Sequence, residues 1–400
     1  MFRTIGNVPK GAANRYWTYG TSVNRANLLA WLYWFVHTCL ILLYSFILFV
    51  YLKLKYGKNV TNNQAQQAID CIPLFIDIYP TSVYPLVVKS IELAYYKHYS
   101  LNEPTLELAT GDGFFTNHLY AGRDNKVTIA SDLIGSTLLQ AKKYKFWRKL
   151  AIIDSTQVPL PGNSLSTIIM NNLIHHLPDR LEVLKEMHRI LRTNGLFIFT
   201  DELTGWATSQ WRDKVNRSNI NNFLNESIQC LLRDSQFWIE QGQTHKWEIC
   251  DIKEFFSNRS MFLSSYLETL NRKIGAPTPK PIRDILDKLP LLKIIQIYLT
   301  TQIAESLITR DAELCKRYGA TSVFVALRKK GRHSQVNDTI LVCPICKNNL
   351  TIIAKGNYCW NCDKTYPFFG DIPFLISYCD DLPVQVFDDI ENKLLLDVSC

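Results

Sequence analysis

The sequence predicts an α/β fold built on a doubly wound, mostly parallel sheet, with one apolar helix before it and a small cysteine-bearing ribbon after it. Three observations lead to this prediction. β-rich runs and helical runs alternate between Leu106 and Glu202, an uncharged apolar segment precedes them, and two CxxC pairs follow them. Alternation of this kind is typical of a parallel sheet with helices on both faces.

The first predicted strand ends at a tight glycine turn. Residues 106–116 read LELATGDGFFT, a buried strand followed by Gly111, Gly113 and the start of a helix. Such a turn leaves backbone N–H groups free at a helix N-terminus, where they can hold a polar ligand. We expect both positions to be glycine because a Cβ at either one would obstruct the approach of that ligand.

Polar side chains follow the next predicted strands. Asp132 lies two residues after one β-rich run, Asp154 directly follows another, and Asn171 closes a third. In a doubly wound sheet ligands bind beyond the carboxyl ends of the strands, so these side chains should share one mouth with Glu107. The β-rich runs are 126–130, 150–153, 166–171, 196–200 and, at the end of the domain, 322–328, and the helical runs are 135–147 and 180–191.

These motifs resemble the class I S-adenosylmethionine-dependent methyltransferases, in particular the group of quinone-biosynthesis and small-molecule methyltransferases. Residues 107–113 match the acidic-x-Gly/Ala-x-Gly-x-Gly first motif, and 154–164 is close to the Asp…Pro-x-Pro-x-x-Ser run. NNLIHHLPD stands where the family often has a His-rich turn, and HRILRTNG matches Arg-x-Leu-x-x-x-Gly. The resemblance covers residues 79–202, and Ala109 departs from it by replacing the commoner first glycine.

The resemblance implies a Rossmann-like sheet of seven strands with S-adenosylmethionine as the cofactor. It implies that Asp132 holds the ribose hydroxyls and that Asp154 faces the adenine amino group. A nicotinamide dinucleotide site is the main rival, but that site wants a third glycine where Thr116 stands. Both acids are also common as simple strand-end turn residues. The full set of implied cofactor residues is Glu107, Ala109, Gly111, Gly113, Asp132, Asp154 and Asn171.

The implied reaction is an in-line displacement at the sulfonium methyl group. The protein then mainly aligns the nucleophile and excludes water. A base is needed only when the acceptor atom carries a proton that must leave. His175 and His176 are the candidates, since a histidine pKa of about 6.5 suits proton removal at neutral pH. The alternative is that one histidine caps the turn after the fourth strand and the other faces solvent.

The apolar segment is predicted to be a transmembrane helix. Residues 28–52 contain no Asp, Glu, Lys or Arg, and a helix rising ~1.5 Å per residue crosses a hydrocarbon core of ~30 Å at this length. Flanking charges do not decide the orientation, but S-adenosylmethionine and free thiols belong to the cytosol. We therefore predict a single-pass membrane protein with its catalytic part on the cytoplasmic side. A buried core helix is the alternative.

A second apolar stretch, 289–308, has two interpretations. It is either an ordinary core-facing helix or an interfacial lid that brings a lipid-like substrate to the site.

Two CxxC pairs predict a structural zinc site. Cys343 and Cys346 are separated by twelve residues from Cys359 and Cys362, a spacing that places four thiolates around one tetrahedral zinc. Two disulfides or free thiols are the alternatives. With the following TYPFFGDIPFLI, the pairs resemble the zinc ribbon that activates several translation-machinery methyltransferases as a separate protein.

The main functional hypothesis is a membrane-anchored methyltransferase with a lipid, isoprenoid or lipid-linked small-molecule acceptor. The alternatives are an RNA or protein methyltransferase with a fused activating ribbon, and a non-catalytic membrane-tethered scaffold. A formal charge of +8 over 400 residues, without a dense basic stripe, does not favour nucleic acid. The predicted parts are a basic tail (1–27), the transmembrane helix (28–52), a methyltransferase domain (60–330, with a helical insertion at about 203–318), the ribbon (338–378) and an acidic tail (379–400).

Overall fold

The computed structural model describes most of the chain. The described residues are 28–56, 63–177, 179–203, 234–244, 246–271, 278–331, 336–338 and 340–377. The predicted tails, 1–27 and 379–400, lie outside them.

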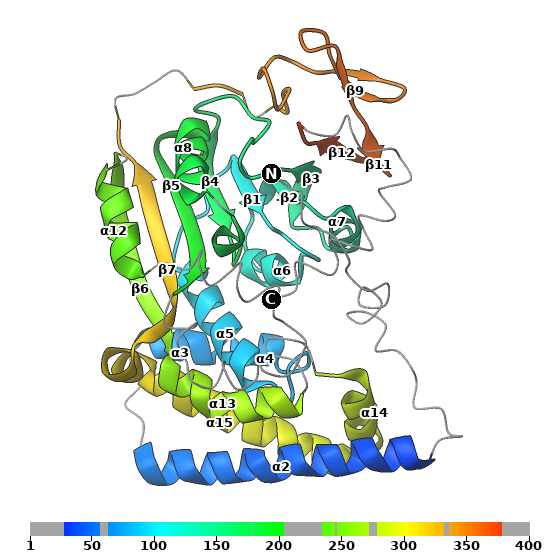
Figure 1. The fold of residues 1–400 in the computed structure, drawn as a ribbon, viewed down its shortest axis with the longest axis vertical. Helices are drawn as coiled ribbons and strands as arrows, with labels where there is room; N and C mark the ends of the chain where they lie inside the picture. Colours follow the sequence, from blue (N-terminus) through cyan, green and yellow to red (C-terminus); the bar gives the residue numbers. More distant parts are fainter. Residues whose placement is uncertain are drawn as a thin grey trace.

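A mixed sheet of nine strands runs through the centre of the molecule, in the order β11-β12-β3-β2-β1-β4-β5-β7-β6 (Figure 1). Neighbours from β12 to β5 are parallel, whereas β7 is antiparallel to both β5 and β6. The strands are β1 (Thr105–Leu108), β2 (Val127–Asp132), β3 (Trp147–Ile153), β4 (Leu165–Met170), β5 (Leu191–Glu202), β6 (Trp247–Ser257), β7 (Ala320–Lys329), β11 (Phe368–Phe369) and β12 (Ile372–Leu375).

The predicted number of seven strands is wrong, although the doubly wound, Rossmann-like centre is confirmed. The two extra strands come from the C-terminal ribbon. β12 runs parallel to β3, with Phe374 opposite Ile152 and Leu375 opposite Ile153, and β11 folds back on β12. The ribbon thus extends the sheet beyond β3 and covers an edge that would otherwise offer unpaired backbone groups.

Helices cover both faces of the sheet because adjacent strand residues point to opposite faces. Ile169 and Ile198 belong to the core beneath α5, α13 and α15, whereas Ile168 and Phe197 belong to the core beneath α8 and α12. The helices on these faces are α3 (Asn63–Ile69), α4 (Ile72–Phe75), α5 (Val83–Lys97), α6 (Phe114–Tyr120), α7 (Gly135–Ala141), η1 (Ile174–His176), α8 (Arg180–Ile190), α12 (Ser235–Thr244), α13 (Asn258–Leu270), α14 (Lys280–Lys288) and α15 (Pro290–Tyr318).

Two features differ from the sequence prediction. The helix expected over 135–147 ends at Ala141, because Trp147 already pairs with Val127 as the first residue of β3. The segment 203–318, expected as a helical insertion, also contains strand β6, with α13 to α15 linking β6 to β7.

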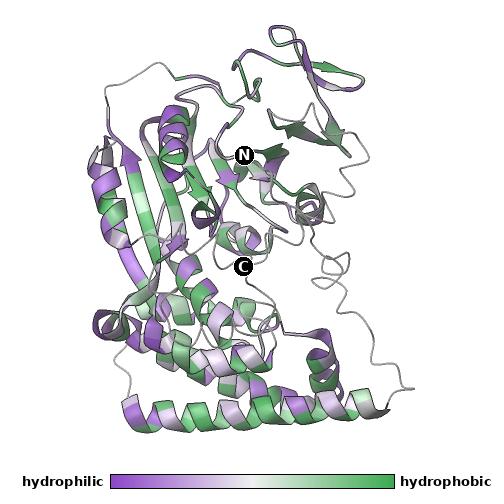
Figure 2. Cartoon of the chain, viewed as in Figure 1, coloured by the Kyte–Doolittle hydropathy of each residue, from purple (hydrophilic) through white to green (hydrophobic). Residues whose placement is uncertain are grey.

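A layer of helices lies at the end of the molecule away from the ribbon. This basal layer consists of α2 (Leu28–Tyr56), α13, α14 and α15, and α2 packs against the other three. Figure 1 shows α2 as its outermost helix, and Figure 2 shows that α2 is mostly apolar. Two helices, Ala30–Tyr56 and Pro290–Tyr318, are long and apolar enough to cross a membrane, a test that a core helix also passes. The single-pass span therefore stays a prediction.

Candidate cofactor site and cysteine cluster

The glycine turn joins β1 to α6 through three residues with positive φ. These are Ala109 at 59°, Gly111 at 58° and Gly113 at 76°. A Cβ on Gly111 would meet nothing within 4 Å, whereas one on Gly113 would lie 2.8 Å from Cε1 of Phe146. The two glycines therefore serve different needs. Gly113 allows close packing between the turn and Phe146, the residue before β3, and Gly111 lines open space in which a ligand can approach the backbone.

Asp132 ties the end of β2 to this turn. Its Oδ2 accepts a hydrogen bond from the Gly111 N–H at 2.8 Å, and its Oδ1 accepts one from the Ile134 N–H at 2.9 Å. Burial raises the pKa of the Asp132 carboxyl, while these backbone N–H groups act in the opposite direction. Each carboxylate oxygen can accept a further hydrogen bond, so both can also receive donors from a ligand.

Glu107 lies fully buried on β1, directly below the turn. The Thr116 hydroxyl of α6 donates a short hydrogen bond to its Oε1, and its Oε2 has no hydrogen-bond partner although it is buried. Burial raises the pKa of Glu107 to about 7, with Asp132 adding to the rise, whereas the Thr116 hydroxyl and the nearby Thr110 side chain lower it. A buried acceptor without a partner costs free energy, which a cationic or N–H-bearing ligand would recover.

Asp154 and Asn171 occupy the ends of the neighbouring strands. Asp154 Oδ1 accepts hydrogen bonds from the Thr156 N–H at 2.8 Å and the Thr156 hydroxyl at 2.7 Å. Both bonds go to one oxygen, which orients the carboxylate. The Thr200 hydroxyl of β5 donates to Asn171 Oδ1 at 2.8 Å. Each predicted side chain is thus held by a local partner rather than projecting freely.

His175 and His176 follow β4 on the short helix η1, with ring centroids 4.1 Å apart. The His175 Nδ1 lies 3.3 Å from Asp201 Oδ1, and both side chains are buried. Burial lowers the pKa of His175, but Glu202 and Asp201 outweigh it and the net pKa is raised. Burial, His175 and Arg180 lower the pKa of His176 to about 3.

The strand order brings the predicted residues together at the carboxyl ends of the strands, since β3, β2, β1, β4 and β5 are consecutive neighbours. Asp201 was missed as a partner of His175 by sequence reasoning, although its place at the end of the fifth strand was a usable signal.

A cleft of about 250 Å³ lies at the amino ends of β1 and β4, lined among others by Tyr99, Ser166 and Arg328. This cleft contains none of the predicted residues, because it lies at the opposite end of the strands from them.

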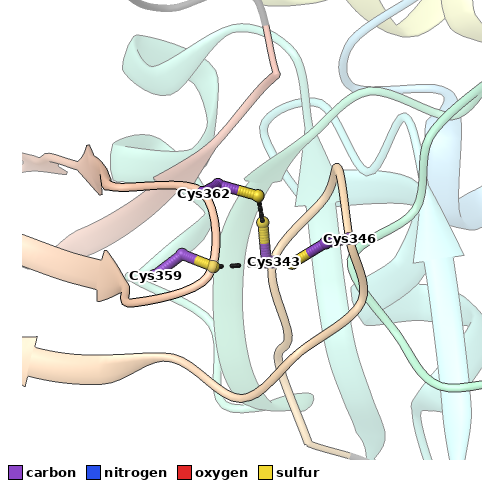
Figure 3. Close-up of side chains that lie close together, drawn as sticks. All are labelled: Cys343, Cys346, Cys359 and Cys362. Carbon is purple, nitrogen blue, oxygen red and sulfur yellow. Dashed lines mark hydrogen bonds between the residues drawn. The ribbon is translucent and has the colours of Figure 1, made fainter.

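The four predicted zinc-ligand cysteines converge on one point (Figure 3). Their sulfur atoms all lie within 4.8 Å of one another. The Sγ–Sγ distance is 3.8 Å between Cys343 and Cys362 and 3.5 Å between Cys346 and Cys359. A small antiparallel sheet supports them, formed by β8 (Thr351–Ile353), β9 (Gly356–Cys359) and β10 (Lys364–Tyr366).

The ribbon also contacts α7, the helix that follows Asp132 of β2. A Cβ added to Gly135, the first residue of α7, would lie 2.6 Å from Cδ1 of Phe369 on β11. The Lys142 ammonium at the end of α7 pairs with Asp371 between β11 and β12. The ribbon therefore holds both ends of α7, beginning three residues after Asp132.

Residues 106–199 match the family model of the methyltransferase domain. With the sheet described above, this match shows a class I, S-adenosylmethionine-dependent methyltransferase domain. The relatives include two malonyl-[acyl-carrier protein] O-methyltransferases. That of Legionella pneumophila is 29% identical over 138 residues, which cover 32% of this chain and 48% of the relative. That of Hamiltonella defensa is 23% identical over 212 residues, covering 52% and 80%. The chain thus spans about half the length of the Legionella relative.

Solved structures with a similar fold are at low identity. The S-adenosylmethionine-dependent methyltransferase of Mesorhizobium loti is 14% identical with a TM-score of 0.36, and the alignment covers 60% of this chain and 97% of that one. A chain from the complex of the Haloferax volcanii Trm112 methyltransferase activator with a methyltransferase is 10% identical with a TM-score of 0.39, covering 69% and 100%.

Proposed function

We propose that this chain is a membrane-associated methyltransferase that transfers the methyl group of S-adenosylmethionine to a lipid, isoprenoid or acyl-linked small molecule. The observation that carries the proposal is the open backbone at Gly111, placed between the buried carboxylate of Glu107 and the half-buried carboxylate of Asp132 at the end of a methyltransferase sheet. The acyl class is supported by the names of the two relatives, and the membrane by the apolar helix α2.

The residues present fit S-adenosylmethionine. The cofactor supplies a methyl group already activated by the sulfonium charge. In the proposed site, Asp132 accepts hydrogen bonds from the ribose hydroxyls, and Asp154 Oδ2 accepts one from the adenine amino group. Gly111 and Ala109 line the space in which the cofactor approaches the backbone. The partnerless Oε2 of Glu107 receives an N–H donor of the amino-acid end. Asn171, already oriented by Thr200, closes the site from β4.

Of the two histidines, His175 is the proposed base for an acceptor whose reacting atom carries a proton. A group with a pKa of about 3, such as His176, holds too little affinity for a proton to remove one at neutral pH. Asp201 is the proposed positioning residue, because its carboxylate lies against the Nδ1 of His175 and orients the imidazole. A carboxylate acceptor would need no base.

The cysteine cluster fits a structural zinc. A tetrahedral site with Zn–S bonds of about 2.3 Å has S–S edges of about 3.8 Å, close to the observed 3.5 and 3.8 Å. Four protein thiolates leave no open position for a substrate, so the metal would stabilise the ribbon and take no part in methyl transfer.

A second candidate is an RNA or protein methyltransferase with its activating ribbon fused in place. The pairing of β12 with β3 favours this candidate, because it joins the ribbon to the sheet that carries Asp132. Labelled methyl transfer to lipid extract, to RNA and to protein extract separates the two candidates by which fraction acquires the label.

The test of the cofactor site is calorimetric titration of the detergent-solubilised full chain with S-adenosylhomocysteine. We expect micromolar binding that is lost in Asp132→Ala and kept in Asp124→Ala, a matched substitution at an exposed aspartate before β2. A folded, zinc-loaded protein that does not bind would overturn the enzyme and favour the non-catalytic scaffold.

A further inference from the structure

The outer face of α2 is apolar from Leu32 to Ile47, and two exposed lysines follow near the end of the helix. One stripe of the helix is buried against the protein at Thr38, Ile41, Ser45, Leu48 and Leu52, spaced three and four residues apart. A helix on the surface of a water-soluble protein carries polar residues opposite such a stripe. Here the opposite stripe consists of exposed Leu32, Val36, Leu40, Leu43, Phe46, Ile47 and Leu54.

Two further helices continue this exposed apolar surface. On α15, Leu291, Ile294, Ile295 and Tyr298 recur at helical spacing and are all exposed. Tyr298 reaches α2 through Phe49, with ring centroids 6.2 Å apart. On α13, exposed Tyr266 packs against Tyr44 of α2 with the rings tilted and their centroids 4.5 Å apart.

The neighbouring helix α14 differs from α2 in that its exposed side chains are charged, as is usual for a helix that faces water. It also packs on α2, but its exposed residues Arg283, Asp287 and Lys288 are charged. The apolar surface is therefore confined to α2, α13 and the first turns of α15, and it ends at a charged rim. Lys53 and Lys55 add exposed positive charge at the end of α2.

Polar contacts hold α2 flat against the domain from His37 to Tyr56, a helix length of about 28 Å. A ring nitrogen of His37 meets the Leu270 carbonyl, and at the other end an Arg310 N–H group donates to the Tyr56 carbonyl at 2.6 Å. Between them, Gln296 donates to the Ser45 hydroxyl at 3.1 Å and Arg259 donates to the Tyr51 hydroxyl at 2.9 Å.

These contacts decide how α2 can meet a bilayer. A docked α2 that crossed the hydrocarbon core would carry α13 and α15 into it, with Arg259, Glu268 and Asp311, and charged groups at that depth are costly. A helix lying in the plane of the interface avoids this cost, because only its outer stripe enters the lipid, to a depth of about 5–10 Å.

We propose that α2, α13 and the start of α15 form a monotopic platform on one leaflet of a bilayer containing anionic lipids, with α2 parallel to the membrane plane. The exposed apolar stripe enters the acyl region, and Lys53 and Lys55 lie at the anionic head groups. This proposal rests on the membrane attachment proposed above and replaces the predicted single-pass span with an in-plane helix.

The platform lies on the same side of the sheet as the cofactor turn. Phe75 of α4 packs on Phe114 and Phe115 at the start of α6, with ring centroids 6.0 and 6.3 Å away. Helix α5 packs against α6 and also against α13 and α15. One helix, α5, thus lies between α6, which begins at the cofactor turn, and the helices of the platform.

Attachment is tested by flotation of the full chain with vesicles of phosphatidylcholine and phosphatidylglycerol. We expect wild-type protein to float and to stay bound after a high-salt wash. The double variant Leu43→Gln/Ile47→Gln should bind the vesicles at least roughly tenfold more weakly, since two apolar side chains no longer enter the acyl region. Ile352→Gln, at an exposed isoleucine of the ribbon, is the matched control and should float as wild type does.

Orientation is tested in sealed vesicles with the full chain carrying a protease-cleavable tag at each end. An in-plane α2 leaves both tags on the outer side, so added protease removes both without detergent. An N-terminal tag protected until detergent is added would show a spanning helix and overturn the proposal.

Two further outcomes would also overturn the platform. Flotation unchanged in the double variant would place attachment on another surface and overturn the platform. A detergent-free dimer that does not float would show that a second copy covers the face. Titration with S-adenosylhomocysteine on the same samples keeps these failures separate from a failure of the methyltransferase proposal, since both exposed substitutions lie away from the cofactor turn.

Discussion

The ribbon and the basal layer are attached to opposite ends of one domain by different physical means. β12 of the ribbon joins the sheet through the backbone ladder with β3, and Phe369 packs on Gly135 beside the Asp132 loop. α2 of the basal layer is held mostly by side chains, with Leu48 and Ile41 buried against its neighbours. Damage to the ribbon should therefore weaken cofactor binding, whereas damage to the packing of α2 should lower stability without reaching the cofactor site.

The largest expected effect is that of removing the zinc ligands. Cys343→Ser leaves three thiolates for the metal, and the free energy of zinc binding is also folding free energy for a ribbon of this size. We expect the ribbon to unfold, the melting temperature to fall by many degrees, and S-adenosylhomocysteine to bind at least tenfold more weakly in calorimetry.

The control for this variant is Cys250→Ser, at an exposed cysteine outside the cluster. It should keep both the melting temperature and the affinity. Wild-type affinity in a zinc-free Cys343→Ser protein would show that the cofactor site does not depend on the folded ribbon.

The next largest effect is expected for Glu107→Gln, which changes the buried carboxylate that accepts the hydrogen bond from Thr116 of α6. The Glu107 pKa of about 7 lies above the ordinary 4.5. Between pH 4.5 and 7 the folded protein therefore keeps a proton that the unfolded chain has lost, and the free energy of unfolding falls as pH rises through this window. We expect Glu107→Gln to stabilise the ligand-free protein at pH 8 by up to about 3 kcal/mol and to weaken cofactor binding.

Urea unfolding at pH 4 and pH 8 measures this effect, with Glu240→Gln, at an exposed position of α12, as the control. Equal stability of the Glu107→Gln and wild-type proteins at pH 8 would show that burial does not strain the carboxylate.

A somewhat smaller effect is expected at the buried stripe of α2. Leu48 is 3% exposed and Leu43 on the same helix is 57% exposed. Leu48→Ala removes packing against the basal layer and should lower the free energy of unfolding in detergent by about 2–3 kcal/mol. Leu43→Ala should change it by less than about 0.5 kcal/mol. Neither should alter S-adenosylhomocysteine affinity, and a change with Leu48→Ala would show that the layer couples to the site.

Sequence patterns predicted those parts that depend on local chemistry. The turn at Gly111 and Gly113 requires positive φ at fixed offsets, and CxxC spacing brings thiolates together over a short distance, so both were readable. The sequence could not show that β12 pairs with β3, because pairing at a sheet edge depends on the packed domain. It also could not show which face of α2 docks, because a segment that is apolar on every side has no periodic signal.

The sharpest version of the comparison is a pair of neighbouring phenylalanines on β11. Phe369 packs on Gly135, whereas Phe368 is exposed. Phe369→Ala leaves the zinc cluster intact and removes only the contact that fixes the start of α7, so we expect S-adenosylhomocysteine to bind several-fold more weakly while zinc content stays unchanged. Phe368→Ala, the control, should bind as wild type does. If both variants bind equally well, the ribbon acts on the site through the β12–β3 ladder rather than through Gly135, and a shorter β12 becomes the variant that should weaken binding.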